Sequence, residues 1–175
     1  GPSIFVTCNG DDTKGWIGRV EVSGNSPGPL LPISASKVEC EVDAPAAAVI
    51  KPEGDLLVSQ LGELNSRPDS LLGFYDTATG KFRKKMETGL RDITAVAYSP
   101  KTGGLYALDL SWAVPGEGKL CKLVADGDRF KAEKLLSLDK PTAMAFAPDG
   151  KLYVALLGPI GEKEKRGRLL RIGGL

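Results

Sequence analysis

Histidine is absent from the 175-residue chain. Its absence excludes Ser-His-Asp and Cys-His catalysis, histidine-ligated zinc and haem, and the side chain that most often acts as a general base near neutral pH. A hydrolase built on this sequence would have to use a metal-bound water with a carboxylate, or a lysine or tyrosine base. No Walker-type or dinucleotide fingerprint is present, because the glycines stand in predicted hairpin turns.

Cysteine, long apolar runs and net charge are also scarce. The three cysteines, Cys8, Cys40 and Cys121, show no CxxC spacing and stand in apolar strand patterns, so we expect reduced, buried thiols. No apolar stretch approaches the roughly 20 residues that span a bilayer. The net charge of +1 gives no overall field for nucleic acid or anionic lipid. We therefore expect neither a nucleic-acid nor a membrane partner. Residues 1–3 resemble the remnant of a cleaved tag.

A motif of alternating apolar residues, a Pro- and Gly-containing turn and a second apolar strand occurs three times. The copies are AAAVIKPEGDLLVSQ, TAVAYSPKTGGLYALD and TAMAFAPDGKLYVALL, and their prolines Pro52, Pro100 and Pro148 recur every 48 residues. A fixed period of this length is typical of solenoids and propellers. Each copy predicts a β-hairpin.

Two further strands follow each hairpin in the pattern. Third strands are predicted at 71–75, 119–123 and 168–172, and more polar fourth strands at 82–86 and 130–136. Hydrophobicity falls from the first to the fourth strand, as expected if the first lines the centre of a ring and the fourth faces solvent at its rim. The sequence therefore predicts an all-β β-propeller of four-stranded antiparallel blades, about four per chain.

The N-terminal part fits the same frame one strand out of phase. IFVTCNG matches LYVALLG and GRVEV matches GRLLRI, while the fourth strand of this repeat is predicted at 37–42. We expect residues 4–175 to form one partial propeller domain, with blades at about 4–43, 44–91, 92–139 and 140–175. The chain holds about 3.6 repeats, and closed propellers have four to eight blades. Three alternatives stay open: a ring shared by two copies, a fragment of a larger propeller, or a small four-bladed ring.

The sequence APDGKLYVA, a loop and GRLLRI resembles the NHL repeat and the related SMP-30, or gluconolactonase-like, propellers. The resemblance extends over residues 46–172, with an inserted residue in the turn at 100–104. It implies a propeller of the six-bladed kind and favours a periplasmic or secreted location. It also implies a lactone hydrolase that holds calcium or zinc through Glu, Asn and Asp at the channel mouth. The residues to test first as ligands are Glu63, Asn65, Asp92 and Asp109. The same residue types also populate surface turns for backbone reasons.

The loops between second and third strands are expected to share one face of the ring. They comprise residues 9–16, 62–69, 109–115 and 158–165, and binding usually resides in long loops on a rigid scaffold. The leading hypothesis is a non-catalytic module that binds a small molecule, a peptide or a protein through this face, with the candidate residues Trp16, Glu63, Asn65, Arg67, Asp109 and Trp112. The alternatives are the calcium- or zinc-dependent hydrolase and a half-propeller whose role is to form a homodimer.

Overall fold

The computed structural model describes residues 3–10, 15–22, 33–38, 42–158 and 167–175, and these contain strands and no helix. The fourteen strands are β1 (Ser3–Cys8), β2 (Trp16–Val22), β3 (Ile33–Val38), β4 (Pro45–Ile50), β5 (Leu56–Gln60), β6 (Leu71–Tyr75), β7 (Phe82–Glu87), β8 (Ile93–Tyr98), β9 (Leu105–Asp109), β10 (Lys119–Asp126), β11 (Arg129–Ser137), β12 (Pro141–Phe146), β13 (Leu152–Leu156) and β14 (Arg168–Ile172). None of the described residues belongs to a helix that could cross a membrane.

The strands form three sheets. β1–β2–β3 and β12–β13–β14 are three-stranded antiparallel sheets, and the eight strands between them form one sheet in the order β4-β5-β6-β7-β11-β10-β9-β8. A single parallel pair, Glu87 with Arg129, joins β7 to β11. The sheet curves so that its edge strands β4 and β8 contact each other, which makes it nearly closed and barrel-like.

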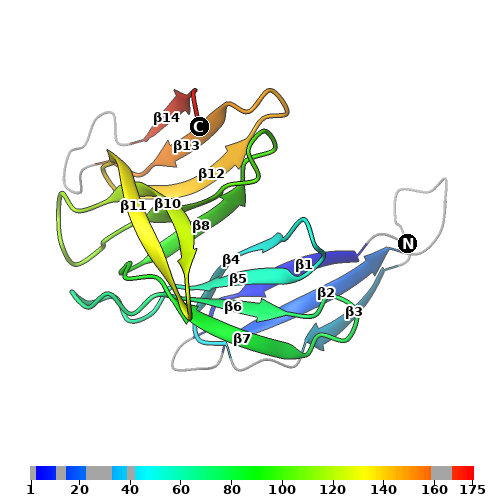
Figure 1. The fold of residues 1–175 in the computed structure, drawn as a ribbon. Coiled ribbons are helices and arrows are strands. Elements are labelled where there is room, and N and C mark those ends of the chain that lie inside the picture. The colour runs from blue at the N-terminus through cyan, green and yellow to red at the C-terminus, as the bar shows by residue number, and fades with distance from the viewer. Residues whose placement is uncertain (1–2, 11–14, 23–32, 39–41, 159–166) are drawn as a thin grey trace.

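The hydrophobic core lies between successive groups of strands. One cluster joins the first sheet to β4–β7 through Ile17, Leu56 and Tyr75. A second joins β4–β7 to β8–β11, and a third joins β8–β11 to the last sheet. All five residues of both β5 and β9 are buried, because each strand is covered on both faces. Figure 1 shows the first sheet beside β4–β7 and the last sheet beside β8–β11.

The predicted strand positions agree with the structure except in the first repeat. The strand expected at 37–42 is β3 at Ile33–Val38, which pairs with β2 from Ile17–Val38 to Val22–Ile33. It begins directly after Pro32 in the sequence, and a proline has no backbone N–H to donate to the ladder. Trp16, expected in a loop, opens β2, and a Cβ at Gly18 would lie 3.0 Å from the Trp16 ring. The separate sheets expected for residues 44–139 are joined, because the nine-residue β11 reaches β7.

Candidate functional site

Antiparallel pairing places the connections 61–70 and 110–118 at one end of the eight-stranded sheet, here called the loop end. The β7–β8 and β11–β12 connections are at the same end of their strands. Part of the predicted binding face lies at this loop end. Residues 62–69 follow β5 there, and Trp112 in the 110–118 connection is 42% exposed. Residues 11–14 and 159–165 of the predicted face are outside the described part of the chain.

Asp109 is fully buried at the end of β9. One carboxylate oxygen lies 2.9 Å from Lys119 Nζ, and backbone N–H groups of Arg91, Asp92 and Ser111 donate to the carboxylate at 3.0–3.3 Å. Burial alone would raise the pKa of Asp109, but the Lys119 ion pair and these N–H donors outweigh it and lower the pKa below 3.8. Asp109 therefore fixes the connection between β7 and β8, which is a structural role.

Asp92 is also fully buried, and it is only partly satisfied. Its Oδ2 accepts the Trp112 N–H at 2.5 Å, whereas its Oδ1 finds no hydrogen-bond partner among the described residues. Burial raises the pKa of this carboxyl; the Trp112 N–H opposes the shift, and the charges of Asp109 and Asp69 add to it. A buried carboxylate with a free acceptor costs stability unless a ligand or water satisfies it.

Trp112 is held in place from the other side by Lys140. The Lys140 ammonium donates to the carbonyls of Ser111 and Trp112 at 2.9 and 2.7 Å and lies 5.3 Å from the centroid of the Trp112 ring. Ser111 and Lys140 both have positive φ, at 47° and 49°, and the buried Ser111 hydroxyl lacks a partner among the described residues. Strained backbone of this kind costs about 1–3 kcal/mol and concentrates at functional positions.

Glu63, Asn65 and Arg67 form a local network on the 61–70 loop. Asn65 Nδ2 donates to Glu63 at 2.7 Å, and the Arg67 N–H donates to Asn65 Oδ1 at 2.6 Å. These bonds shape a turn and leave Glu63 and Arg67 exposed. Of the four predicted metal ligands, the structure therefore brings Glu63 into contact with Asn65 and Asp92 into contact with Asp109. Among the described residues, no group of three or more His, Cys, Asp or Glu side chains is placed to hold a metal ion. Calcium or zinc binding stays a prediction.

Sequence reasoning missed three residues of this site: Lys119, Lys140 and Ser111. Lys119 stands directly opposite Asp109 in the β9–β10 ladder, so a search for opposite charges at the ends of predicted neighbouring strands would have found the pair. Lys140 is the repeat equivalent of Asp92. The Lys140 carbonyl accepts a hydrogen bond from the Leu157 N–H, directly after β13, and the Asp92 carbonyl accepts one from the Leu110 N–H, directly after β9. The sequence signal that could have identified Lys140 is the change from an acidic residue, Asp92, to a basic one at the same position of the repeat.

Cys121 is buried and free, as expected. Cys8 is free but only half-buried, so the expected burial is wrong for this residue, and Cys40 is outside the described residues. Burial raises the pKa of the Cys121 thiol to about 11, so this thiol is protonated and unreactive at neutral pH.

No family model matches the sequence, and no curated protein matches it. Solved structures do. The PQQ-bound aldose sugar dehydrogenase of Streptomyces coelicolor aligns with a TM-score of 0.59 at 15% identity, over 97% of this chain and 57% of its own. A putative oxidoreductase (glucose dehydrogenase) of Thermus thermophilus aligns with a TM-score of 0.55 at 17% identity, over 75% of this chain and 44% of its own. An auxiliary nutrient binding protein of Bacteroides ovatus aligns with a TM-score of 0.53 at 12% identity, over 81% and 34%.

These neighbours are β-propeller proteins. The fold is of the β-propeller type. At identities of 12–17% the likeness shows the fold and nothing of the chemistry. The chain spans between 34% and 57% of the length of these structures. The propeller expected from the 48-residue period is therefore confirmed as a fold type, while membership of the NHL or SMP-30 families stays a prediction.

Proposed function

We propose that the chain is a non-catalytic binding module on a β-propeller scaffold, with blades of four strands, and that its loop end takes a small polyhydroxylated ligand. The observation that carries the proposal is the immobilised, exposed indole of Trp112. The backbone of this residue bonds to Asp92 and Lys140, while 42% of its surface remains open. An exposed aromatic ring on tightly bonded backbone, next to the strained Ser111, is a preorganised surface for stacking.

Asp92 supplies the polar half of such a site. Its Oδ1, which has no hydrogen-bond partner among the described residues, is a buried carboxyl oxygen that can accept a hydrogen bond from a hydroxyl donor. A sugar ring offers an apolar face for Trp112 and hydroxyl groups for Asp92. Two of the structural neighbours are sugar dehydrogenases by name and the third binds nutrients, which agrees with this ligand class.

The test is a calorimetric titration with a panel of aldoses, followed by the variants Trp112→Ala and Trp16→Ala. We expect Trp112→Ala to weaken binding roughly tenfold, because an aromatic contact contributes about 0.5–1.5 kcal/mol beyond the area it buries and the substitution also removes that buried area. Trp16→Ala is the matched control, since Trp16 opens β2 in the first sheet and its ring lies over Gly18. Equal losses in the two variants, or no binding of any aldose, would contradict the proposal.

The metal-dependent lactone hydrolase is the second candidate, and the unpaired buried oxygens favour it. Asp69 Oδ1, Asp92 Oδ1 and Ser111 Oγ have no hydrogen-bond partner among the described residues, and calcium prefers oxygen ligands. A bound ion would raise the melting temperature by mass action. We expect calcium to raise the melting temperature of the wild-type protein and not of Asp92→Asn if this candidate is right. Glu63→Gln then tests whether the surface loop contributes.

The third candidate function is self-association into a shared ring. The outer faces of the first and last sheets carry exposed apolar side chains, among them Ile4, Val6 and Leu169. Blade sheets need neighbours on both faces to bury such residues. A homodimer would supply them, and its test is the molar mass in solution.

A further inference from the structure

A cavity separate from the loop end lies between the two halves of the eight-stranded sheet. It has a volume of about 750 Å³ and is lined by β6 and β7 on one side and by β9, β10 and β11 on the other. The hairpin turns at 51–55 and 103–104 border it, so it opens at the end opposite the loop end. This volume is within the range of small-molecule sites.

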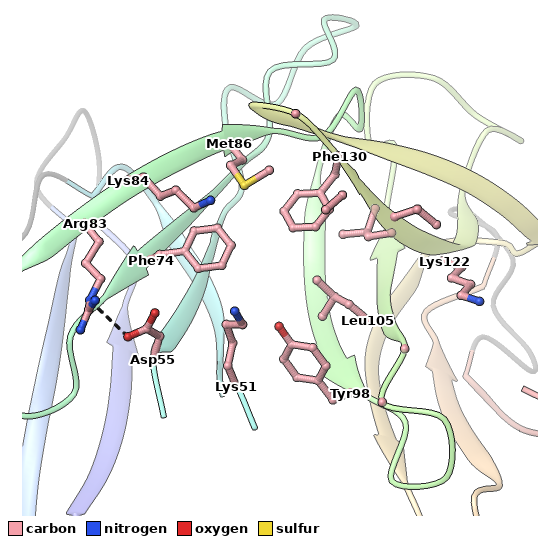
Figure 2. Close-up of a pocket in the computed structure, with 16 residues that line it drawn as sticks. Lys51, Asp55, Phe74, Arg83, Lys84, Met86, Tyr98, Leu105, Lys122 and Phe130 are labelled. Atoms are coloured by element: carbon pink, nitrogen blue, oxygen red, sulfur yellow. Dashed lines mark ion pairs between the residues drawn. The ribbon is translucent and has the colours of Figure 1, made fainter. Parts of the chain in front are cut away.

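The inner part of the cavity is apolar and aromatic. The rings of Phe74 and Phe130 are nearly parallel, with an interplanar angle of 16° and centroids 6.3 Å apart. Met86 and Leu105 extend this surface, and Figure 2 shows the side chains of Phe74, Met86, Phe130 and Leu105 directed into the space between the two halves. An aromatic body can therefore be buried against side chains from both halves.

The polar lining is dominated by cations. Lys51 Nζ and Lys84 Nζ lie 5.7 and 5.2 Å from the centroid of the Phe74 ring. Asp55 is the acid of the lining, and it is already paired with Arg83 at 3.2 Å. Lys84 forms no ion pair with the described residues, and the Glu53 that pairs with Lys51 has a largely exposed side chain. Two ammonium groups over one ring repel each other unless an anion joins them.

Tyr98 adds a hydrogen-bond donor beside these lysines. Figure 2 shows its side chain at the mouth of the cavity, close to Lys51. Burial raises the pKa of Tyr98 to about 12, with Glu53 as a smaller cause, so the hydroxyl keeps its proton at physiological pH.

We propose that this cavity binds a small aromatic carboxylate, with Lys51, Lys84 and Tyr98 holding the carboxylate and Phe74 and Phe130 contacting the aromatic body. The arrangement favours one charged end and one apolar end in the same ligand. Inorganic anions would miss the aromatic surface, and neutral aromatics would bring no counter-charge to Lys84, which forms no ion pair with the described residues. The proposal does not depend on the function assigned to the loop end.

The probes are 2-naphthoate and its neutral analogue 2-naphthamide, titrated by calorimetry and by amide chemical-shift changes. We expect the carboxylate to bind roughly tenfold more tightly than the amide, and its affinity to fall as salt is raised. Chemical-shift changes should centre on the residues around Phe74 and Phe130. Failure of the carboxylate to bind, or equal affinity for the two probes, would overturn the proposal.

Lys84→Gln and Lys85→Gln form a matched pair on β7, because Lys85 is exposed and does not line the cavity. We expect Lys84→Gln to weaken 2-naphthoate binding roughly three- to tenfold and Lys85→Gln to leave it unchanged. An equal loss of 2-naphthoate affinity in the two variants would mean that only the general surface charge attracts the probe, and this would overturn the proposed binding site. Phe130→Leu should weaken both probes while keeping the difference between them, and its fold is checked by circular dichroism.

Discussion

Asp109 shows how one buried carboxylate can fix the approach of two repeats. Replacing it with Asn leaves Lys119, whose side chain is 13% exposed, without its counter-charge. Breaking a buried ion pair from one side is strongly destabilising, so we expect Asp109→Asn to lower the free energy of unfolding by about 2–4 kcal/mol. Urea denaturation measures it. Glu21→Gln, which breaks the partly exposed Arg19–Glu21 pair, should change stability by less than about 1 kcal/mol.

Asp92 and Asp109 should make the free energy of unfolding depend on pH in opposite directions. Because burial raises the pKa of Asp92 above 3.8, the folded state holds this proton more tightly than the unfolded chain. Stability is therefore greatest below the unfolded pKa and falls as the pH rises from about 3.8 to the raised value. Asp109, whose pKa is lowered, contributes stability above its unfolded pKa and loses it below 3.8.

We expect Asp92→Asn to remove the loss of stability above pH 3.8 and to be no less stable than the wild type near neutral pH. The asparagine can still accept the Trp112 N–H and has no charge to desolvate. Urea denaturation at a series of pH values measures the difference. An unchanged slope between pH 4 and 7 in the variant would show that Asp92 does not titrate in this range.

At the scale of the element, the repeated hairpin is the part of the structure that the sequence predicts best. The Gly54 N–H donates to Lys51 O, and Gly150 repeats the bond to Ala147 O. In the middle copy Gly103 donates to Ser99 O, one residue further back, which is how the inserted residue is accommodated. Turn chemistry is local, so it can be read from a few consecutive residues.

Gly103 is held at a φ of +67°, and a Cβ there would meet nothing within 4 Å. The cost of a substitution is then backbone strain alone. We expect Gly103→Ala to lower the free energy of unfolding by about 1 kcal/mol and Gly103→Asn to cost less, because asparagine tolerates the left-handed region better. Thermal and urea denaturation of the two variants distinguish these values, and equal costs would contradict the strain explanation.

Contacts between strands of different repeats could not be predicted from the sequence, for a physical reason. Phe74 and Phe130 are 56 positions apart on strands of different repeats, and their stacking depends on the angle between the two halves of the sheet. The Glu87–Arg129 pair that joins β7 to β11 depends on that angle too. The same holds for Lys140, which reaches Trp112 from the next repeat. Periodicity gives the strands, whereas these sites arise from how the repeats pack.

At the scale of the whole molecule, equivalent residues in successive repeats differ in exposure. Tyr106 on β9 is 3% exposed and packs edge-on against Phe146 of the following sheet at 5.4 Å, whereas its equivalent on β13, Tyr153, is 37% exposed. Leu120 on β10 is fully buried, and its equivalent on β14, Leu169, is 71% exposed. The outer face of the last sheet therefore has the side chains of a packed blade and no blade against it among the described residues. Figure 1 shows this sheet at one extreme of the molecule.

Leu169 allows a direct test of the proposed homodimer. An exposed apolar face of this kind favours association, so we expect light scattering behind a sizing column to give about twice 18.5 kDa, with the monomer appearing on dilution. Leu169→Glu should shift the protein to the monomer, because a charge on the packed face would be desolvated. Leu64→Glu is the control, since Leu64 is 54% exposed on the β5–β6 loop, which belongs to the eight-stranded sheet and to neither terminal sheet. A wild-type protein that stays monomeric at every concentration, or equal effects of the two variants, would rule out a second copy as the cover of this face.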